Sequence, residues 1–328
     1  MIKKMREMPV IILKLEALLR RLSLKHQRRK SIEEELAMRY AGFRGEQALD
    51  YHIAQIPQKN HFIFQDLRLP LSKDSFFQID ILLLSQQYFI ILEAKNIAGT
   101  IFIDQNQLLR TLDEKEDSYP NPIQQVENQQ YNLDELIENH CKIKLPITSF
   151  VAMTNPSSII KPNPQYSAVA KKVIRPAAIR QRFGAVNYSY QKELIEKIEL
   201  QKLSRLLIGM HTPSDPDILK QFQIGKGEIL TGIYCDQCNN LSMTKRQRVW
   251  ECTICSYTSK NAHIQALIDY RLLIGSTISC KQCSSFFQIS SSISSKLLRS
   301  LNLNFFGEGK NRAYKLELED LQKLIKNK

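Results

Sequence analysis

The sequence predicts an α/β protein in which one α/β unit precedes a cysteine-rich region. A helical pattern in residues 31–56 leads into short apolar strands between residues 62 and 103, and a helix at 123–139 precedes a strand at 147–153. Six of the seven cysteines follow residue 227. With 43% hydrophobic and 24% charged residues, the 328-residue chain has a globular composition, which excludes a disordered or fibrous protein.

Positive charge is concentrated at the start of the chain. The net charge is +13, and residues 1–30 contribute +8 of it, from ten basic and two acidic residues. Residues 9–24 are expected to form a basic amphipathic helix, with apolar positions Ile12, Leu15, Leu18, Leu19 and Leu22. Such a helix can bind nucleic acid or an anionic membrane, pack on the body, or remain solvated. The bases that residues 1–30 would offer to DNA are Arg20, Arg21, Arg28 and Arg29.

A second helix and four strands follow. Residues 31–56 have helical spacing, and Gly42 and Gly45 are expected to allow close approach of another element before Pro57 ends the helix. Apolar runs separated by turn residues then indicate strands. These are expected at Phe62–Leu69, Gln78–Leu84, Tyr88–Glu93 and Thr100–Ile103.

Two CxxC pairs predict a structural zinc site. Thirteen residues separate the pair Cys235 and Cys238 from the pair Cys252 and Cys255, and two such turns supply the tetrahedral sulfur shell that Zn²⁺ prefers. Disulfides are not expected, because we expect a cytoplasmic protein, whose thiols stay reduced. The loop between the pairs carries bases and Trp250, which either contacts nucleic acid or packs over the metal-centred core.

A third CxxC, Cys280 and Cys283, has no partner pair, and two buried or idle thiols are the favoured interpretation. A helix at 291–302 and two strands within 304–318 then give the outline of a winged helix or of another small α+β cap. Its candidate DNA contacts are Lys296, Arg299, Lys310 and Arg312. The expected organisation is 1–40 basic helical segment, 41–155 α/β domain, 156–226 helical connector, 227–262 zinc ribbon and 263–328 C-terminal cap.

Asp80, Glu93 and Lys95 form the most informative constellation. In an extended strand Glu93 and Lys95 project from one face, and a neighbouring strand can bring Asp80 beside them. Two carboxylates can hold a hard cation such as Mg²⁺, and a lysine can orient a water for attack on phosphorus. The alternative is structural: Asp80 faces solvent and Glu93 pairs with Lys95 or with another base.

Four short motifs resemble those of the nuclease-related domain, the NERD family. They occur in the order and approximate spacing of that family over about residues 42–155, and their combination is more specific than any one of them. The family is similar to the PD-(D/E)xK restriction-endonuclease-like nucleases, and basic members with a C-terminal zinc-binding region look like a bacterial subset. The motifs are Gly42–Glu46, Gln78–Asp80, Glu93–Asn96 with Gly99, and Asn121–Gln125.

The resemblance implies a restriction-endonuclease-like mixed sheet flanked by helices. It implies that Asp80 and Glu93 bind Mg²⁺ or Mn²⁺ and that Lys95 positions the nucleophilic water. Glu46 resembles the accessory acid of the superfamily, and Gln125 matches a helix glutamine that faces the site. Ile79 stands where some relatives have a proline.

These observations predict a cytoplasmic, metal-dependent DNA nuclease with a structural zinc ribbon. No apolar run approaches the roughly 20 residues of a transmembrane helix, and no signal-peptide pattern is expected at the N-terminus. The alternative is a non-catalytic module that binds nucleic acid or protein with the same fold. Peripheral membrane contact by the N-terminal helix is a third, less favoured reading.

Overall fold

The computed structural model describes residues 1–56 and 61–326, so that Pro57, expected to end the second helix, lies outside the described residues. The side chains of Lys310 and Lys326 are also outside the described part. The chain forms two compact units. Unit 1 comprises Met1–Pro9 and Met38–Ser214, and unit 2 comprises Val10–Ala37 and Asp215–Lys328.

A six-stranded mixed sheet lies at the centre of unit 1, in the order β1-β2-β3-β4-β8-β10. Strands β2, β3 and β4 pair antiparallel, whereas β1 with β2, β4 with β8 and β8 with β10 pair parallel. The α/β class expected from the sequence is therefore confirmed. The strands are β1 Ile2–Lys4, β2 Phe62–Pro70, β3 Phe76–Leu84, β4 Phe89–Lys95, β8 Ile147–Met153 and β10 Val173–Ile174.

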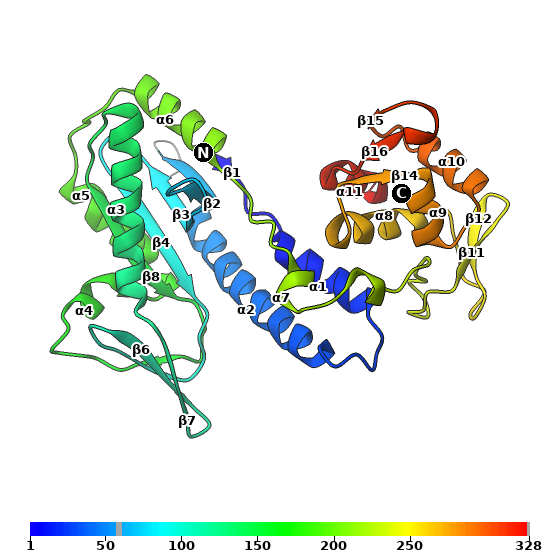
Figure 1. Cartoon of the computed structure of the whole chain (residues 1–328). Helices are drawn as coiled ribbons and strands as arrows, with labels where there is room; N and C mark the ends of the chain where they lie inside the picture. The colour runs from blue at the N-terminus through cyan, green and yellow to red at the C-terminus, as the bar shows by residue number, and fades with distance from the viewer. Residues whose placement is uncertain (57–60, 327–328) are drawn as a thin grey trace. The chain divides into compact units, whose positions relative to one another are not determined.

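Helices cover both faces of this sheet (Figure 1). On one face α3 (Pro122–Cys141) and α6 (Lys197–Met210) share a core with Leu82 and Leu84 of β3. On the other face α2 (Arg29–Ala54) and α5 (Ile179–Ser189) share a core with Ile81 and Leu83. Alternate residues of one strand thus feed opposite cores, as expected for a strand buried on both sides.

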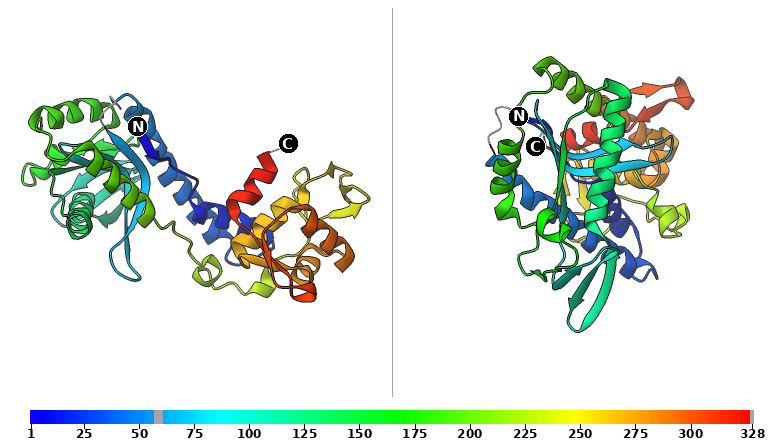
Figure 2. Two further views of the ribbon diagram at one scale, coloured as in Figure 1. Left: turned by 90° about the horizontal axis from the view of Figure 1, so that it is seen from above. Right: turned by 90° about the vertical axis from the view of Figure 1, so that its left-hand side faces the viewer.

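A smaller four-stranded sheet has the order β7-β6-β5-β9. Its strands β5 and β6 share a core with Ile123 and Val126 at the start of α3. The β6–β7 hairpin extends away from the rest of the unit (Figure 2, right-hand view). Val169 of the short helix α4 (Ala168–Lys172) joins the core of this region. The strands are β5 Thr100–Ile103, β6 Gln107–Leu112, β7 Lys115–Pro120 and β9 Ile159–Ile160.

One continuous hydrophobic core joins the parts of unit 2. It contains residues of α1 (Val10–Arg21), of α8 (Ala262–Leu273), of the cysteine region and of the C-terminal cap. The cap contains a three-stranded sheet in the order β14-β16-β15. The remaining elements are α7 Ile218–Gln221, β11 Met243–Arg246, β12 Val249–Cys252, β13 Thr258–Ser259, β14 Thr277–Ser279, α9 Cys280–Phe287, α10 Ser291–Ser300, β15 Phe305–Phe306, β16 Ala313–Lys315 and α11 Leu318–Lys326.

Of the four arginines expected to be offered to DNA, Arg20 and Arg21 are engaged by a buried acidic residue of unit 2, whereas Arg28 is exposed. Arg21 has 0% of its surface exposed and donates to the Asp269 carboxylate at 2.8 Å. Arg20 donates to the other oxygen of Asp269 at 2.9 Å. Arg29 donates to the carbonyl of Leu19, and Arg28 to the side chain of Gln223. Within the described residues, every helix falls short of the length and apolar character needed to cross a membrane.

Candidate active site and metal centre

Asp80 lies where strands β3 and β4 separate. The β3–β4 ladder ends at the pair Ile81 and Leu92, whereas the pairing of β4 with β8 continues to Lys95. In place of a ladder hydrogen bond, the Asp80 carboxylate accepts from the backbone N–H of Ala94 at 2.8 Å. The Asp80 side chain therefore bridges two diverging strands at the end of an apolar sheet.

The opposite strand is also irregular at this point. The pairs formed by Gln65 and Leu67 with β3 leave Asp66 facing Asp80 across the ladder, and Asp66 has a φ of 54°. Ile79 packs on the same face of the sheet as Leu82, so the alternation of β3 changes phase here. A non-glycine residue in this conformation is strained, and such strain occurs often at functional sites.

Glu93 is the centre of a hydrogen-bond network. Lys95 Nζ donates to Glu93 Oε1 at 2.7 Å and to Gln125 Oε1 at 2.8 Å, and Gln125 Nε2 donates to Glu93 Oε1 at 2.6 Å. From the next turn of α3, Gln129 Nε2 donates to Glu93 Oε2 at 2.8 Å. The structure thus brings together Glu93, Lys95 and Gln125, three of the expected site residues.

The carboxylates of the site perturb one another. Burial raises the pKa of Asp80 well above its usual range, and the charges of Glu93 and Glu46 raise it further, against the Ala94 hydrogen bond and Lys95. Burial also raises the pKa of Glu46 to about 7, although Arg6 opposes the change. Paired carboxylates with raised pKa values are typical of functional sites and of sites that take up a cation.

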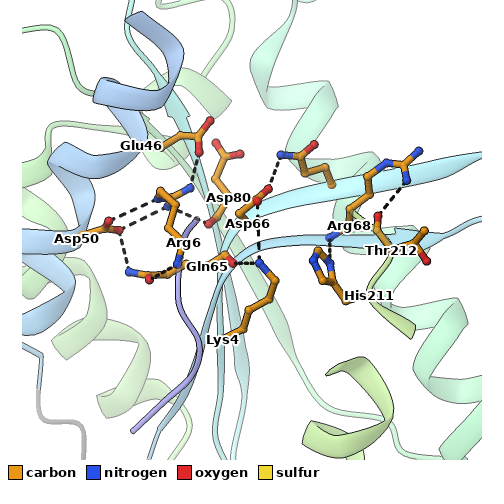
Figure 3. Close-up of polar contacts among 11 residues, drawn as sticks. Lys4, Arg6, Glu46, Asp50, Gln65, Asp66, Arg68, Asp80, His211 and Thr212 are labelled. Atoms are coloured by element: carbon orange, nitrogen blue, oxygen red, sulfur yellow. Dashed lines mark hydrogen bonds and ion pairs between the residues drawn. The ribbon is translucent and has the colours of Figure 1, made fainter. Parts of the chain in front are cut away.

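Glu46 reaches the site from α2 and is held by an arginine (Figure 3). Arg6 forms an ion pair with Glu46 and a second with Asp50 one turn further along the helix. The same guanidinium donates to the backbone carbonyl of Asp80 at 3.2 Å. Only 3% of the Arg6 side chain is exposed, compared with 20% of the Glu46 side chain.

Asp80 and Glu93 fit a hard divalent cation by their chemistry. Both are buried, at 7% and 4% exposure, and both offer the oxygen ligands that Mg²⁺ and Mn²⁺ prefer. Nearby, Gln129 Oε1 is buried without a hydrogen-bond partner. Among the described residues, however, only the cysteine cluster brings three or more ligand atoms within 4.8 Å of one another, so the three carboxylates do not form a closed ligand triad. The carboxylates that could hold a cation here are therefore the pair Asp80 and Glu93, without Glu46 as a third ligand.

Two residues of this site were not found from the sequence. Gln129 lies four residues after Gln125 on the same face of α3, so the helical period contained a usable signal. Arg6 lies 74 positions before Asp80, and nothing in the short basic stretch around it marks a site residue.

Several motif residues hold the framework of the site. Gly45 allows α2 to approach the end of β4, because a Cβ there would lie 2.5 Å from Asn96 Cβ. Gly42 has open space around it, so the expectation of close approach is confirmed for Gly45 and wrong for Gly42. Asn96 donates to the Ala41 carbonyl at 2.7 Å. Asn121 caps α3 by accepting from the backbone N–H of Ile123 and thereby sets the start of the helix that carries Gln125.

The four cysteines of unit 2 converge as a metal site requires. Cys238 and Cys252 have their sulfur atoms 3.5 Å apart, and Cys235 and Cys255 have theirs 3.7 Å apart. Sulfur atoms around a tetrahedral zinc with bonds of about 2.3 Å lie roughly 3.8 Å from one another. The cluster therefore has the dimensions to hold a structural metal such as zinc.

Each cysteine pair forms a tight turn of the same kind. The residue after each second cysteine, Asn239 or Ser256, has a φ near 57°. Burial raises the pKa of Cys252, but hydrogen bonds from Ser242 and from the N–H groups of Cys255 and Ile254 outweigh it and lower the pKa to about 6. These donors favour the thiolate, the form that binds metal.

Trp250 and the third CxxC are part of the core of unit 2. Trp250 is fully buried and donates from Nε1 to His263 at 3.0 Å, so of the two expectations for Trp250 the structure supports core packing. Cys283 is buried and Cys280 half-buried, both in α9, and neither belongs to the metal cluster of the described residues.

Comparison with known proteins identifies one region of the chain. Residues 41–154 match the family model of the nuclease-related domain, NERD, which confirms the resemblance inferred from the four motifs. No curated protein and no solved structure matches the chain. Residues 41–154 therefore form a nuclease-related domain, and the site at Asp80, Glu93 and Lys95 lies inside it.

Proposed function

We propose that the nuclease-related domain at residues 41–154 hydrolyses phosphodiester bonds of DNA with Mg²⁺ or Mn²⁺ bound by Asp80 and Glu93. The observation that carries this proposal is the convergence of Glu93, Lys95 and Gln125 beside a buried Asp80 at the point where β3 and β4 separate. A buried carboxylate is costly when its neighbours are also acidic, and the charges of Glu93 and Glu46 raise the pKa of the buried Asp80 beyond the effect of burial. This cost favours a functional role over a purely structural one.

Each residue then has a role that follows from its contacts. Bound at Asp80 and Glu93, the cation would stabilise the negative charge that develops on the phosphate during attack. Lys95, with 24% of its side chain exposed, has an ammonium group that can donate to an incoming water or phosphate oxygen. Gln125 and Gln129 fix the two oxygens of Glu93. Glu46 supplies the accessory carboxylate from α2.

The charge of the chain supports nucleic acid as the substrate. A net charge of +13 favours a polyanion through counterion release. In unit 2 the β11–β12 hairpin carries Arg246 at the end of β11, with a side chain that is 70% exposed, and the exposed Arg248 in its turn. We assign unit 2, with its structural zinc, to holding the nucleic acid.

A non-catalytic binding module is the second candidate. One observation favours it: Glu93, Lys95 and Gln125 already satisfy one another by hydrogen bonds, as in a structural network. A module of this kind would bind nucleic acid with no dependence on Mg²⁺ or Mn²⁺ and would cleave nothing.

A cleavage assay on the zinc-loaded full chain separates the two candidates. Single-stranded, duplex and branched DNA are incubated with Mg²⁺ or Mn²⁺, and then with chelator. Lys95→Ala and Glu93→Gln are each expected to lower the cleavage rate about 100-fold or more. Their matched controls, the exposed Lys144→Ala and Glu135→Gln, should retain it.

The combined variant provides a further check. Because the two residues act together, the double variant Glu93→Gln, Lys95→Ala should be scarcely slower than either single variant. Equal residual cleavage by the wild type and by Lys95→Ala would identify a contaminating nuclease. Absence of cleavage with every substrate and both metals would favour the binding module.

A further inference from the structure

Arg6 lies outside the matched residues 41–154 but makes contacts within the site. Its guanidinium pairs with Glu46 and Asp50 on α2 and donates to the backbone carbonyl of Asp80 on β3. Figure 3 shows the guanidinium lying between these acidic groups. One side chain thus joins the helix that carries the accessory acid to the strand that carries an expected cation ligand.

The segment that carries Arg6 is anchored to the sheet. Strand β1 pairs parallel with β2, and Lys4 Nζ donates to the Gln65 carbonyl at 2.9 Å. The backbone N–H of Arg6 donates to Gln65 Oε1 at 2.9 Å, and Gln65 Nε2 donates to Asp50 at 2.8 Å. Arg6 is therefore held by its backbone as well as by its side chain, and Gln65 connects it to the same helix.

We propose that Arg6 is a positioning residue of the site: its guanidinium fixes Glu46 of α2 relative to Asp80 of β3. This inference rests on the proposed function, because positioning has a consequence only if the site is catalytic. It extends the working nuclease unit beyond the family match to the segment Met1–Pro9, which belongs to unit 1.

The geometry requires an arginine rather than any base. The planar guanidinium presents several N–H donors in a fixed fork, so that it can satisfy two carboxylates and a carbonyl at once. A lysine at position 6 would keep the charge but could not reproduce this arrangement. Arg6→Lys should therefore restore only part of what Arg6→Gln loses.

Steady-state kinetics of the zinc-loaded full chain provide the first test. Arg6→Gln is expected to lower kcat about 10- to 100-fold, as do other changes to residues that orient metal ligands, with KM for DNA nearly unchanged. The matched control Lys3→Gln removes the same charge from the same segment, where Lys3 lies over the Phe62 ring, and should leave kcat unchanged. In a Glu46→Gln background, Arg6→Gln should add little further loss.

Binding of Mn²⁺, followed by electron paramagnetic resonance, tests the inference without cleavage. Removing a positive charge beside a cation site should tighten binding by electrostatics alone, whereas loss of positioning should weaken it. Weaker Mn²⁺ binding by Arg6→Gln, partly restored in Arg6→Lys, supports positioning. Unchanged or tighter binding overturns it, even if kcat falls.

The two proposals fail in different ways. A wild-type chain that cleaves DNA and an Arg6→Gln variant that cleaves equally well overturn this inference alone. A wild-type chain that neither binds Mn²⁺ nor cleaves any DNA rejects the proposed function and this inference with it. Circular dichroism of Arg6→Gln and Arg6→Lys verifies that both variants fold.

Discussion

Gly45 illustrates at the scale of single residues how a motif residue is required by packing. It lies in α2 one position before Glu46, and a Cβ at this position would lie 2.5 Å from Asn96 Cβ and 2.8 Å from Thr154 Oγ1. Both distances are shorter than real Cβ contacts. The close approach of helix and strand that places Glu46 near Asp80 therefore depends on a missing side chain.

The two glycines of α2 should respond to alanine in opposite ways. Gly45→Ala is expected to destabilise unit 1 by about 1 to 3 kcal/mol through overpacking. Gly42→Ala, in the same helix with open space around it, should stabilise by up to about 1 kcal/mol. Hydrogen exchange of the β3 and β4 amides measures the stability change that each variant causes. Equal effects of the two changes would contradict the packing argument.

The local geometry of the site could be predicted where it depends on neighbours in sequence. Glu93 and Lys95 are two residues apart in a strand, so their shared face followed from the period, and their atoms lie 2.7 Å apart. The burial of Asp80 followed less directly, because it depends on where β3 and β4 separate. Arg6 could not be predicted, because its contacts depend on the pairing of β1 with β2.

At the scale of elements, a buried ion pair attaches α1 to α8 within unit 2. Arg21 and Asp269 both have fully buried side chains, and Arg21 also donates to the Gly232 carbonyl at 2.7 Å. Burial lowers the pKa of Arg21, and Asp269 opposes this change. A buried charge without its partner is strongly destabilising, so each of these residues requires the other.

Removal of the acidic partner should therefore weaken unit 2 strongly. Asp269→Ala is expected to lower the free energy of unfolding by about 3 to 5 kcal/mol. The control Asp320→Asn, which breaks an exposed pair with Lys323 in α11, should cost less than about 1 kcal/mol. The free energy of unfolding of each variant is measured in urea by the fluorescence of Trp250, which is the single tryptophan of the chain and lies in unit 2. Similar losses of unfolding free energy in the two variants would show that the buried pair contributes no more to stability than an exposed pair.

Elements with an apolar period were predicted well, and polar ones were missed. The strand expected at 147–153 and the strand at 100–103 match β8 and β5. Strand β7, Lys115–Pro120, contains Lys, Glu, Asp and Ser and is mostly exposed, so no hydrophobic alternation marks it. Strand β1 has three residues, too few for any period.

At the scale of the whole molecule, the two units are interleaved along the chain. Unit 2 combines Val10–Ala37 with Asp215–Lys328, whereas the sequence suggested consecutive segments. The reason is physical: the apolar face of α1 shares one core with the cysteine region and the cap. Composition and spacing cannot reveal which distant segment covers an amphipathic helix.

The metal cluster should support this common core. Cys252→Ser is expected to lose the bound zinc and to lower the stability of unit 2, because structural zinc contributes directly to folding. The control Cys280→Ser changes a cysteine outside the cluster and should keep about one zinc per chain. Metal analysis gives the zinc content of each variant, and Trp250 fluorescence gives the stability of unit 2. Full zinc content in Cys252→Ser would refute the four-cysteine site.

The central claim is that the buried carboxylates of the nuclease-related domain bind a catalytic cation rather than form a closed structural network. Electron paramagnetic resonance counts the bound Mn²⁺ and so distinguishes these two possibilities, provided that zinc already fills the cysteine site. About one Mn²⁺ is expected per wild-type chain and none in the double variant Asp80→Asn, Glu93→Gln, with the Glu135→Gln control unchanged. Equal Mn²⁺ binding by the double variant and the wild type, or none by either, would contradict it.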